Sequence, residues 1–251
     1  MILARLTRAI RTQNWFAVVL EFVIVVAGVL LAFQISAWNA ERLVHERAER
    51  SLIDLHDDFA AIDITASELA TFYQGVIHDL EILVRAVDAG EIAPDQVDAI
   101  RRALAYGDVF ADPPPPSGTF RDLQGSGRLS LVENQQLRLR LIEYEQSLEN
   151  ISDSDANINI MLTPFSVAFK RHIRYDPEYH LPDTLDLAFY DVTLPEVAEI
   201  DFDALLTDPE FEVAAQQHLR LQIGRFINLR VSQSKIAQIR TMIDAALEDP
   251  S

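Results

Sequence analysis

The side chains of this chain best suited to bind a metal ion or to act as general acids and bases are six histidines and 39 acids, and there is no cysteine. The absence of cysteine excludes thiol nucleophiles, disulfides and Cys-ligated zinc or iron–sulfur sites. The histidines form neither His-x-x-x-His nor His-Glu-x-x-His, the spacings typical of zinc sites on a helix. His56, Asp57 and Asp58 offer metal-binding atoms, but consecutive helical residues point in different directions. A solvated acidic face is therefore the favoured interpretation.

Three further patterns suggest chemistry, and a structural interpretation is preferred for each. The Gly-Ser-Gly sequence at residues 125–127 resembles the start of a phosphate-binding loop, but it lacks a third glycine, a preceding strand and a Gly-Lys-Ser/Thr sequence. Asp155 interrupts an apolar helical seam, where it could bind a ligand or set helix register, and a locally wet face is favoured. His172 and His180 flank a turn rich in tyrosine and proline, where packing or capping is expected. We predict no catalytic residue, no metal site and no cofactor.

The stretch from Trp15 to Trp38 is the element around which the chain is organised. It is apolar, and Glu21 is its only charged residue. About 20 apolar residues suffice for a helix to cross a bilayer about 30 Å thick. Trp15, Trp38 and Asn39 are expected to anchor the ends of this helix at the membrane–water boundaries. The sequence therefore predicts a transmembrane helix over residues 15–38.

One face of this helix combines a carboxyl group with small residues. Gly28, Ala32 and Ser36 recur every four residues, a spacing that lets two helices approach closely in a membrane. Glu21 falls on the same face, whereas Gln34 projects from another and could bond a neighbouring helix. Glu21 could be a proton or ion relay or a partner contact, and it could equally be a protonated or snorkelling residue that only positions the helix.

Residues 1–14 form a basic amphipathic N-terminus with three arginines, and three more arginines follow the span, so the Lys/Arg count leaves orientation tied. The N-terminal flank has three arginines and no acid, whereas acids accompany the second set, although acids contribute little to this rule. We favour a cytoplasmic N-terminus and an extracytoplasmic bulk in a bacterial inner membrane. A cleaved signal peptide is disfavoured, since the apolar run is too long. The formal net charge of -18 argues against a nucleic-acid partner.

Helical periodicity dominates the rest of the chain. Residues 39–51 are expected to form a juxtamembrane helical stalk. From Leu52 to Val87 apolar residues recur at alternating spacings of three and four, which is typical of helices packed in a bundle. Ile53 and Ile64 are among the residues that flank this seam, so a stripe wider than a coiled coil needs is expected to be buried. Gly90 should end the helix as a C-cap glycine.

Beyond Gly90 the sequence predicts two short helices and a second long one. Pro94 should open a helix that runs to about Tyr106. Thr119 and Asp122 resemble a capping pair for another short helix. A long helix is expected over residues 134–174, kinked or split at Pro164.

Residues 175–206 are expected to form a mostly irregular crossover. The sequence Thr207-Asp208-Pro209 should then start a last helix that runs to about Glu248. The residues of this helix expected to face inward are Phe211, Ala215, Leu219, Ile223, Phe226, Leu229, Ile236, Ile239, Ile243 and Leu247. The predicted fold is all-α: a transmembrane helix that continues into an elongated antiparallel bundle of three long and a few short helices over residues 52–248.

Two stretches carry a family resemblance. The first is Glu21-x6-Gly28-Val29-Leu30-Leu31-Ala32-Phe33-Gln34-Ile35-x-x-Trp38-Asn39. The second is Phe120-x-x-Leu123-x-x-Ser126-Gly127-x-Leu129-x-Leu131-Val132-x-Asn134-x-x-Leu137. In these the chain resembles a family of uncharacterised bacterial single-pass inner-membrane proteins with an α-helical extracytoplasmic region. The resemblance implies a topology, and it implies no activity.

These observations lead to one functional expectation and two alternatives. We expect a non-enzymatic, homo-oligomeric membrane protein, assembled through the face of Glu21, Gly28 and Ala32, whose bundle acts as a scaffold or senses a ligand. Its partners would be the lipid bilayer, further copies of itself and an unknown membrane or periplasmic protein. The first alternative is an accessory subunit of a transport or ion-conducting complex that uses Glu21. A membrane-tethered hydrolase is the second, and no motif favours it.

Overall fold

The computed structural model describes residues 15–177 and 197–248, with side chains in residues 18–152, 162–177 and 197–248. The chain divides into two compact units, residues 1–51 and 52–251. Helix α2 (Trp15–Ala89) supplies the described part of the first unit and the first helix of the second. Within the described residues, α2 is the helix long and apolar enough to cross a membrane: its most apolar 18-residue window has a mean hydropathy of 2.6 and is not buried.

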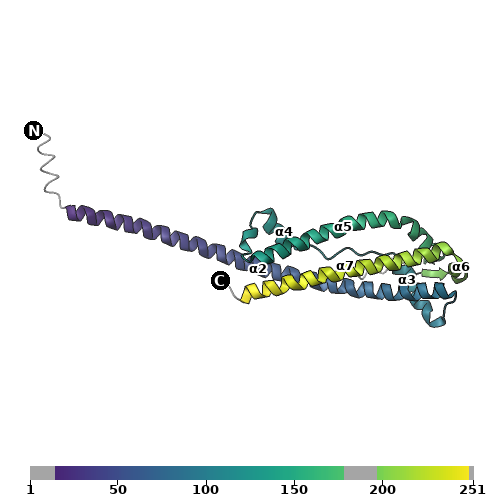
Figure 1. The fold of residues 1–251 in the computed structure, drawn as a ribbon. Helices are drawn as coiled ribbons and strands as arrows, with labels where there is room; N and C mark the ends of the chain where they lie inside the picture. The colour runs from purple at the N-terminus through teal and green to yellow at the C-terminus, as the bar shows by residue number, and fades with distance from the viewer. Residues whose placement is uncertain (1–14, 178–196, 249–251) are drawn as a thin grey trace, which may run out of the picture. The chain divides into compact units, whose positions relative to one another are not determined.

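The second unit confirms the expected all-α fold class (Figure 1). The elements after α2 are η1 (Pro94–Gln96), α3 (Val97–Tyr106), α4 (Gly118–Gly125), η2 (Leu129–Leu131), α5 (Gln135–Phe169), β1 (Ile173–Tyr175), β2 (Val197–Ile200), α6 (Phe202–Thr207) and α7 (Pro209–Glu248). The two strands pair antiparallel, with Ile173 opposite Ile200 and Tyr175 opposite Val197.

Contacts between the long helices fix their directions. On α2 and α5, Phe59 packs edge-to-face on Tyr144, and Leu80 lies in the same core cluster as Phe169, so these two helices run the same way. Helix α7 runs against both, as Figure 1 shows. The bundle therefore has one parallel pair, because the loop between α3 and α4 returns the chain before α5 begins.

The core of the second unit has two apolar clusters. The first joins α2, α4, α5 and the C-terminal half of α7 around Phe59, Phe120 and Tyr144. The second joins α2, α3, α5, α6 and the N-terminal part of α7 around Leu80, Phe169 and Phe211. The predicted seam of α2 is buried from Leu55 to Val87. Its predicted flank is wrong at Ile53 and Ile64, which are 44% and 62% exposed, because both lie opposite the seam, on the outer face of the helix.

Helix ends follow local capping chemistry. Gly90 ends α2 with φ 70°, as a C-cap glycine should. The predicted capping pair of α4 is wrong: Ser117 is the N-cap, and its hydroxyl accepts a hydrogen bond from the Phe120 amide at 3.0 Å. Asp58 on α2 supports this cap by accepting bonds from the Ser117 hydroxyl and the Thr119 amide. Asp122 pairs instead with Arg128.

The second long helix ends earlier than predicted. Helix α5 stops at Phe169, with Lys170 as its C-cap residue, and the chain turns into β1 before Arg174. Pro164 lies inside α5 and does not split it, and α5 follows a curved path in Figure 1. The predicted crossover over residues 175–206 starts at the last residue of β1 and contains β2 and most of α6 at its other end. Its middle, residues 178–196, lies outside the described residues together with His180. The side chain of Asp155 is also outside them.

Helix α7 begins at Pro209 as predicted, but the face it buries differs from the prediction. Between Phe211 and Leu229 the buried residues include His218, Gln222 and Arg225, all polar. Leu219 and Phe226 are only partly buried, and Ile223 is exposed. The apolar pattern misled here because the core accepts polar groups that bond to buried backbone carbonyls.

Candidate functional site

The predicted membrane-packing residues lie on a fully exposed helical surface. Glu21, Gly28, Ala32 and Ser36 are exposed and share one face of α2, while Gln34 is exposed on another. A Cβ added at Gly28 would meet nothing within 4 Å. The small residues therefore leave this face of α2 without bulky side chains, so a second helix could approach it closely.

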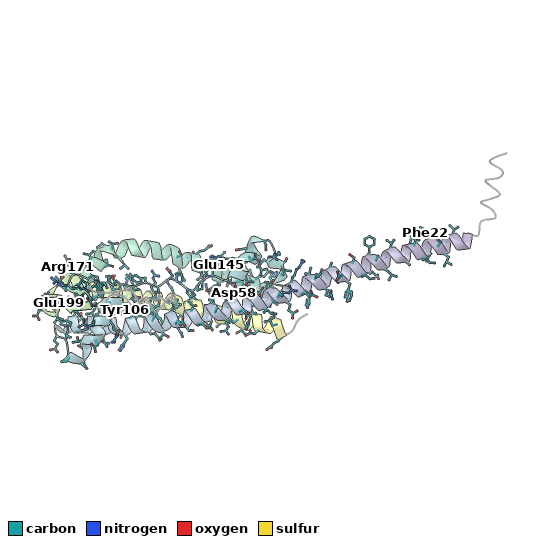
Figure 2. All side chains as sticks on the ribbon, turned by 180° about the vertical axis from the view of Figure 1, so that it is seen from behind. Phe22, Asp58, Tyr106, Glu145, Arg171 and Glu199 are labelled. Carbon is teal, nitrogen blue, oxygen red and sulfur yellow. The ribbon has the colours of Figure 1, made fainter. Side chains whose placement is uncertain are left out.

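The apolar side chains around this face have the same exposure. Phe22 is 68% exposed and projects from α2 in Figure 2, and Trp38 is 67% exposed. Asn39 accepts a hydrogen bond from Arg42 at 3.5 Å. The side chain of Trp15 lies outside the described residues, as does the basic segment 1–14. Burying apolar surface gains about 25 cal/mol per Å², so covering this surface with lipid or with another helix would be favourable.

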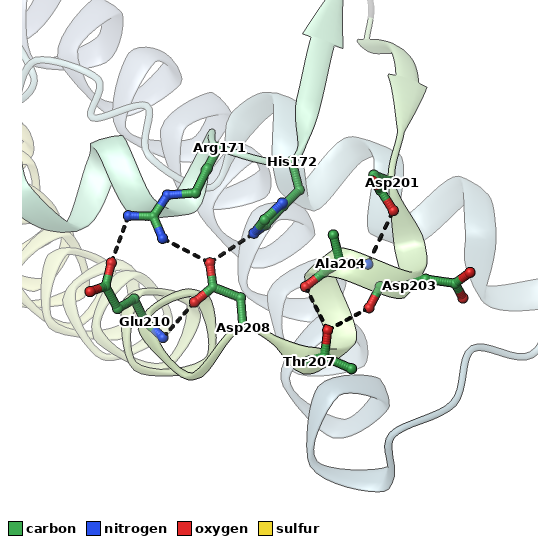
Figure 3. Close-up of polar contacts among 8 residues, drawn as sticks. All are labelled: Arg171, His172, Asp201, Asp203, Ala204, Thr207, Asp208 and Glu210. Carbon is green, nitrogen blue, oxygen red and sulfur yellow. Dashed lines mark hydrogen bonds and ion pairs between the residues drawn. The ribbon is translucent and has the colours of Figure 1, made fainter.

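The second candidate site is a polar junction between the residues just before β1 and the start of α7 (Figure 3). His172 Nε2 lies 2.8 Å from Asp208 Oδ2, and Arg171 donates to the same oxygen at 3.0 Å. A second guanidinium nitrogen of Arg171 donates to Glu210 at 2.6 Å. Asp208 also caps α7, since its Oδ1 accepts from the Glu210 amide at 2.9 Å. His172 thus has the packing role expected of it, because it links the start of β1 to α7.

The electrostatics of the junction centre on Asp208. The hydrogen bond from His172 holds the pKa of Asp208 down to about 2, and the amides of α7 and the charge of Arg171 act in the same direction. A histidine oriented by a carboxylate is two thirds of a nucleophilic triad. The nearby hydroxyl of Thr207, however, donates to the carbonyls of Asp203 and Ala204. The junction therefore holds structure together and presents no activated nucleophile among the described residues.

Removing the Asp208 carboxylate should destabilise the second unit. We expect Asp208→Ala to lower the free energy of unfolding at pH 7 by about 1–2 kcal/mol, the usual cost of losing an N-cap. Because the folded-state pKa is depressed, the native contribution is present above about pH 4 and is lost as pH falls toward 2. The difference between parent and variant should thus disappear in acid, as measured by urea unfolding followed by circular dichroism in mild detergent.

Asp203→Ala is the matched control for this measurement, because Asp203 is exposed in the first turn of α6 and its carboxylate forms no hydrogen bond or ion pair with the described residues. A loss of stability equal in both variants, or one that persists unchanged at pH 2, would contradict the proposed role of Asp208.

A row of buried polar residues on α7 was missed by sequence analysis. His218 is fully buried, stacks on Phe169 at 4.5 Å and holds the Ala214 carbonyl through Nδ1 at 2.8 Å. Burial lowers the pKa of His218. Its Nε2 lies 3.4 Å from the Ser166 hydroxyl.

One turn further along α7, Gln222 donates to the carbonyls of Gly107 and Val109, both at 2.9 Å. Lys170 supports the same loop by pairing with Asp108 at 2.9 Å and donating to Leu104 O at 2.6 Å. These residues hold the polypeptide that follows α3 against α7, and no conventional motif marks them in the sequence.

The other sequence candidates separate in space. His56 lies 3.1 Å from Asp57 and 3.7 Å from Asp244, whereas Asp58 points to the cap of α4. Within the described residues no cluster of histidines and acids could hold a metal ion. The Gly-Ser-Gly sequence forms the turn that ends α4, with Gly127 at φ 69°. A cavity of about 30 Å³ beside Arg225 and the proline-rich loop holds one or two water molecules at most.

Comparison with protein-family models, with characterised proteins and with solved structures found no match to this chain. The resemblance to a family of single-pass membrane proteins therefore stays a hypothesis that the two sequence stretches support. The function has to be argued from the exposed span and the bundle.

Proposed function

We propose that this chain is a single-pass membrane protein that assembles into homo-oligomers through its span and uses its helical bundle as a scaffold or ligand-sensing domain. The observation that carries the proposal is the exposed apolar window of α2, with one small-residue face, on the same helix that enters a packed bundle. A bacterial inner membrane, with the N-terminus in the cytoplasm and the bundle outside it, is the location we propose. No nucleic acid is proposed as a partner, because the chain is strongly acidic.

Association through the span predicts the effect of adding bulk at Gly28. Gly28 is exposed and a Cβ added there would meet nothing within 4 Å, so the effect of Gly28→Leu reports on contacts between copies. Overpacking a close helix interface costs about 1–3 kcal/mol, and about 1.4 kcal/mol corresponds to a tenfold change in affinity. We therefore expect association of the full-length chain in detergent micelles to weaken about tenfold, as measured by energy transfer between labelled copies.

Ala27→Leu is the matched control, since it adds similar bulk one residue away on a different face of the same helix. Association that is equally strong in Gly28→Leu and in the parent would refute packing through this face. Association weakened equally by both variants would show that the span responds to bulk alone.

A second candidate is supported by Glu21, the only charge between Trp15 and Trp38. An intramembrane carboxyl is costly, and such residues mark proton and ion pathways. In this alternative the chain is an accessory subunit of a transport or ion-conducting complex. Glu21→Gln should then abolish proton flux in reconstituted vesicles while leaving assembly intact, and unchanged flux would rule the alternative out.

A further inference from the structure

The outer face of α7 is apolar at its centre. Ile223, Ile227 and Val231 recur every four residues and are 36%, 55% and 53% exposed. Because a helix turns by about 100° per residue, these three side chains form one ridge. The buried residues Gln222, Arg225 and Leu229 occupy the opposite face. Two of the three buried residues are therefore polar, whereas the three side chains of the outer ridge are apolar, which is unusual for a surface helix.

The ridge continues into a groove. Further along the same face, Ser234, Gln238 and Thr241 form one wall of an open groove of about 580 Å³, and Gln136 and Arg140 of α5 form the other. The α7 wall has no charged residue, and Ser234, Ala237 and Thr241 on it are small, which allows another helix to approach. Ridge and groove together make a surface about five turns long, a length suited to an amphipathic helix.

Charge restricts what can cover this surface. From Val213 to Ile243 the chain has five lysines and arginines and no acid, although its formal net charge is -18. Arg230 beside the ridge bonds only to Gln233 among the described residues, and no ion pair is formed by Arg220 or Lys235 there. Arg225 is buried and Arg240 pairs with Asp63, so they do not contribute to this surface. A second α7 would oppose Arg220, Arg230 and Lys235 to the same cations of its copy, so a symmetric α7–α7 contact is disfavoured. The complement has to be an acidic helix with apolar residues.

The outer face of α2 has this composition. Between Leu52 and Ala89 the exposed charged residues are five acids and one arginine: Asp54, Asp57, Glu68, Glu81, Asp88 and Arg85. The other three acids bond within the same copy: Asp58, Asp63 and Asp79. Ile64 is the most exposed large apolar side chain of this part of α2, and Glu68 is exposed one turn further along the same face. The outer face of α2 therefore complements that of α7 in both shape and charge.

The two faces also lie at the same level of the bundle. Asp63 pairs with Arg240, and Gln233 donates to the Ala66 carbonyl at 3.3 Å. These contacts place Ile64 level with the groove and Glu68 level with Arg230 within one copy. Two copies side by side in the same orientation would bring Ile64 of one to the groove of the next, and Glu68 to Arg230.

We propose that a second copy of this chain docks on α7, with the outer face of its α2 seated along Ile227, Val231 and the adjoining groove. The contact joins different faces of two copies, so it leads to a ring or a row of bundles. It rests on the proposed homo-oligomer only in that both copies share one membrane, where tethering raises their effective concentration. The packing of spans at Gly28 is a separate contact.

The absence of cysteine makes this contact directly testable in the full-length chain. Two differently tagged forms, one carrying Ala61→Cys and the other Gln238→Cys, are reconstituted together in lipid nanodiscs and treated with a short bismaleimide. Both positions are exposed, so folding is not at issue. Cross-linking should occur between the two forms and exceed like-with-like products by about fivefold or more, since about 1 kcal/mol separates attractive from repulsive exposed charge pairs.

Charge reversal tests the paired side chains. Glu68→Arg in the Ala61→Cys form, or Arg230→Glu in the Gln238→Cys form, should lower the mixed product about fivefold, and both together should restore it. Loss without restoration, or no loss, would overturn the Glu68–Arg230 pairing and with it the proposed register.

The remaining outcomes each overturn the proposed partner. Preferential cross-linking between two Gln238→Cys forms would assign the face to a symmetric α7 contact. No cross-link, with Gln238→Cys shielded from maleimide only in anionic lipid, would assign it to lipid. No cross-link and no shielding would show that copies do not meet here. Repeating the mixture with Gly28→Leu separates the two proposals: the cross-link should persist even where span packing is lost.

Discussion

Gly107→Ala should lower the free energy of unfolding of the second unit by about 2–3 kcal/mol. A Cβ at this position would lie 2.8 Å from Leu80 Cδ2, 3.0 Å from Phe169 Cζ and 2.4 Å from the Ala103 carbonyl oxygen. Leu80 and Phe169 are fully buried on α2 and α5, so neither can move aside without disturbing a packed cluster. Overpacking of this kind typically costs about 1–3 kcal/mol.

Thermal unfolding followed by circular dichroism at 222 nm measures this effect. About 1 kcal/mol shifts Tm by about 2–4 °C in a domain of this size, so a decrease of about 5–10 °C is expected. Gly75→Ala is the matched control: Gly75 lies in α2 with open space around it, and the variant should gain about 0.5–1 kcal/mol. A Gly107→Ala variant that melts at or above the parent would show that α3 does not end against Leu80 and Phe169.

The sequence predicted those parts of the fold that depend on local chemistry. The seam of α2, the C-cap at Gly90 and the start of α7 at Pro209 all follow from periodicity, glycine conformation or proline at a first turn. Each is decided by residues within a few positions of one another, which is why a single sequence suffices.

Contacts between distant segments explain the wrong predictions. Thr119 looked like a cap, but Asp58, 61 residues earlier, selects Ser117 by binding both its hydroxyl and the Thr119 amide. The end of α5 was placed too late because Ile173 continues the helical spacing, and only its pairing with Ile200 shows that it belongs to a strand.

The candidate site divides in the same way. The exposed face of the span could be predicted from residue type and spacing alone. The row formed by His218 and Gln222 could not be predicted, because both residues interrupt an apolar pattern. The partners of Gln222 are carbonyls of a loop more than 100 residues away in the sequence. The outer ridge of α7 was hidden for the same reason, since Ile223 was expected to be inside.

Gln222→Glu should cause the other large loss of stability. The side chain of Gln222 is fully buried, and its Nε2 donates to the carbonyls of Gly107 and Val109 at 2.9 Å. A carboxylate of the same shape has no proton to donate and would face two carbonyl oxygens. Burying such a charge without a donor costs about 2–5 kcal/mol, so we expect a loss of that size at pH 7.

The pH dependence distinguishes this cause from a simple packing defect. Burial and the facing carbonyls would raise the pKa of the introduced carboxyl, and its neutral form can donate one hydrogen bond. The loss relative to the parent is therefore full above the raised pKa and shrinks as pH falls through it toward about 4.3. The parent changes in the opposite direction, because burial lowers the pKa of His218 and stability is lost as pH falls below 6.5.

Urea unfolding of both proteins from pH 8 to pH 5 gives the difference in the free energy of unfolding at each pH. Gln216→Glu, exposed on the same helix, should stay within about 0.5 kcal/mol of the parent throughout. A loss in Gln222→Glu that is independent of pH would mean that the two carbonyls are not held by this side chain.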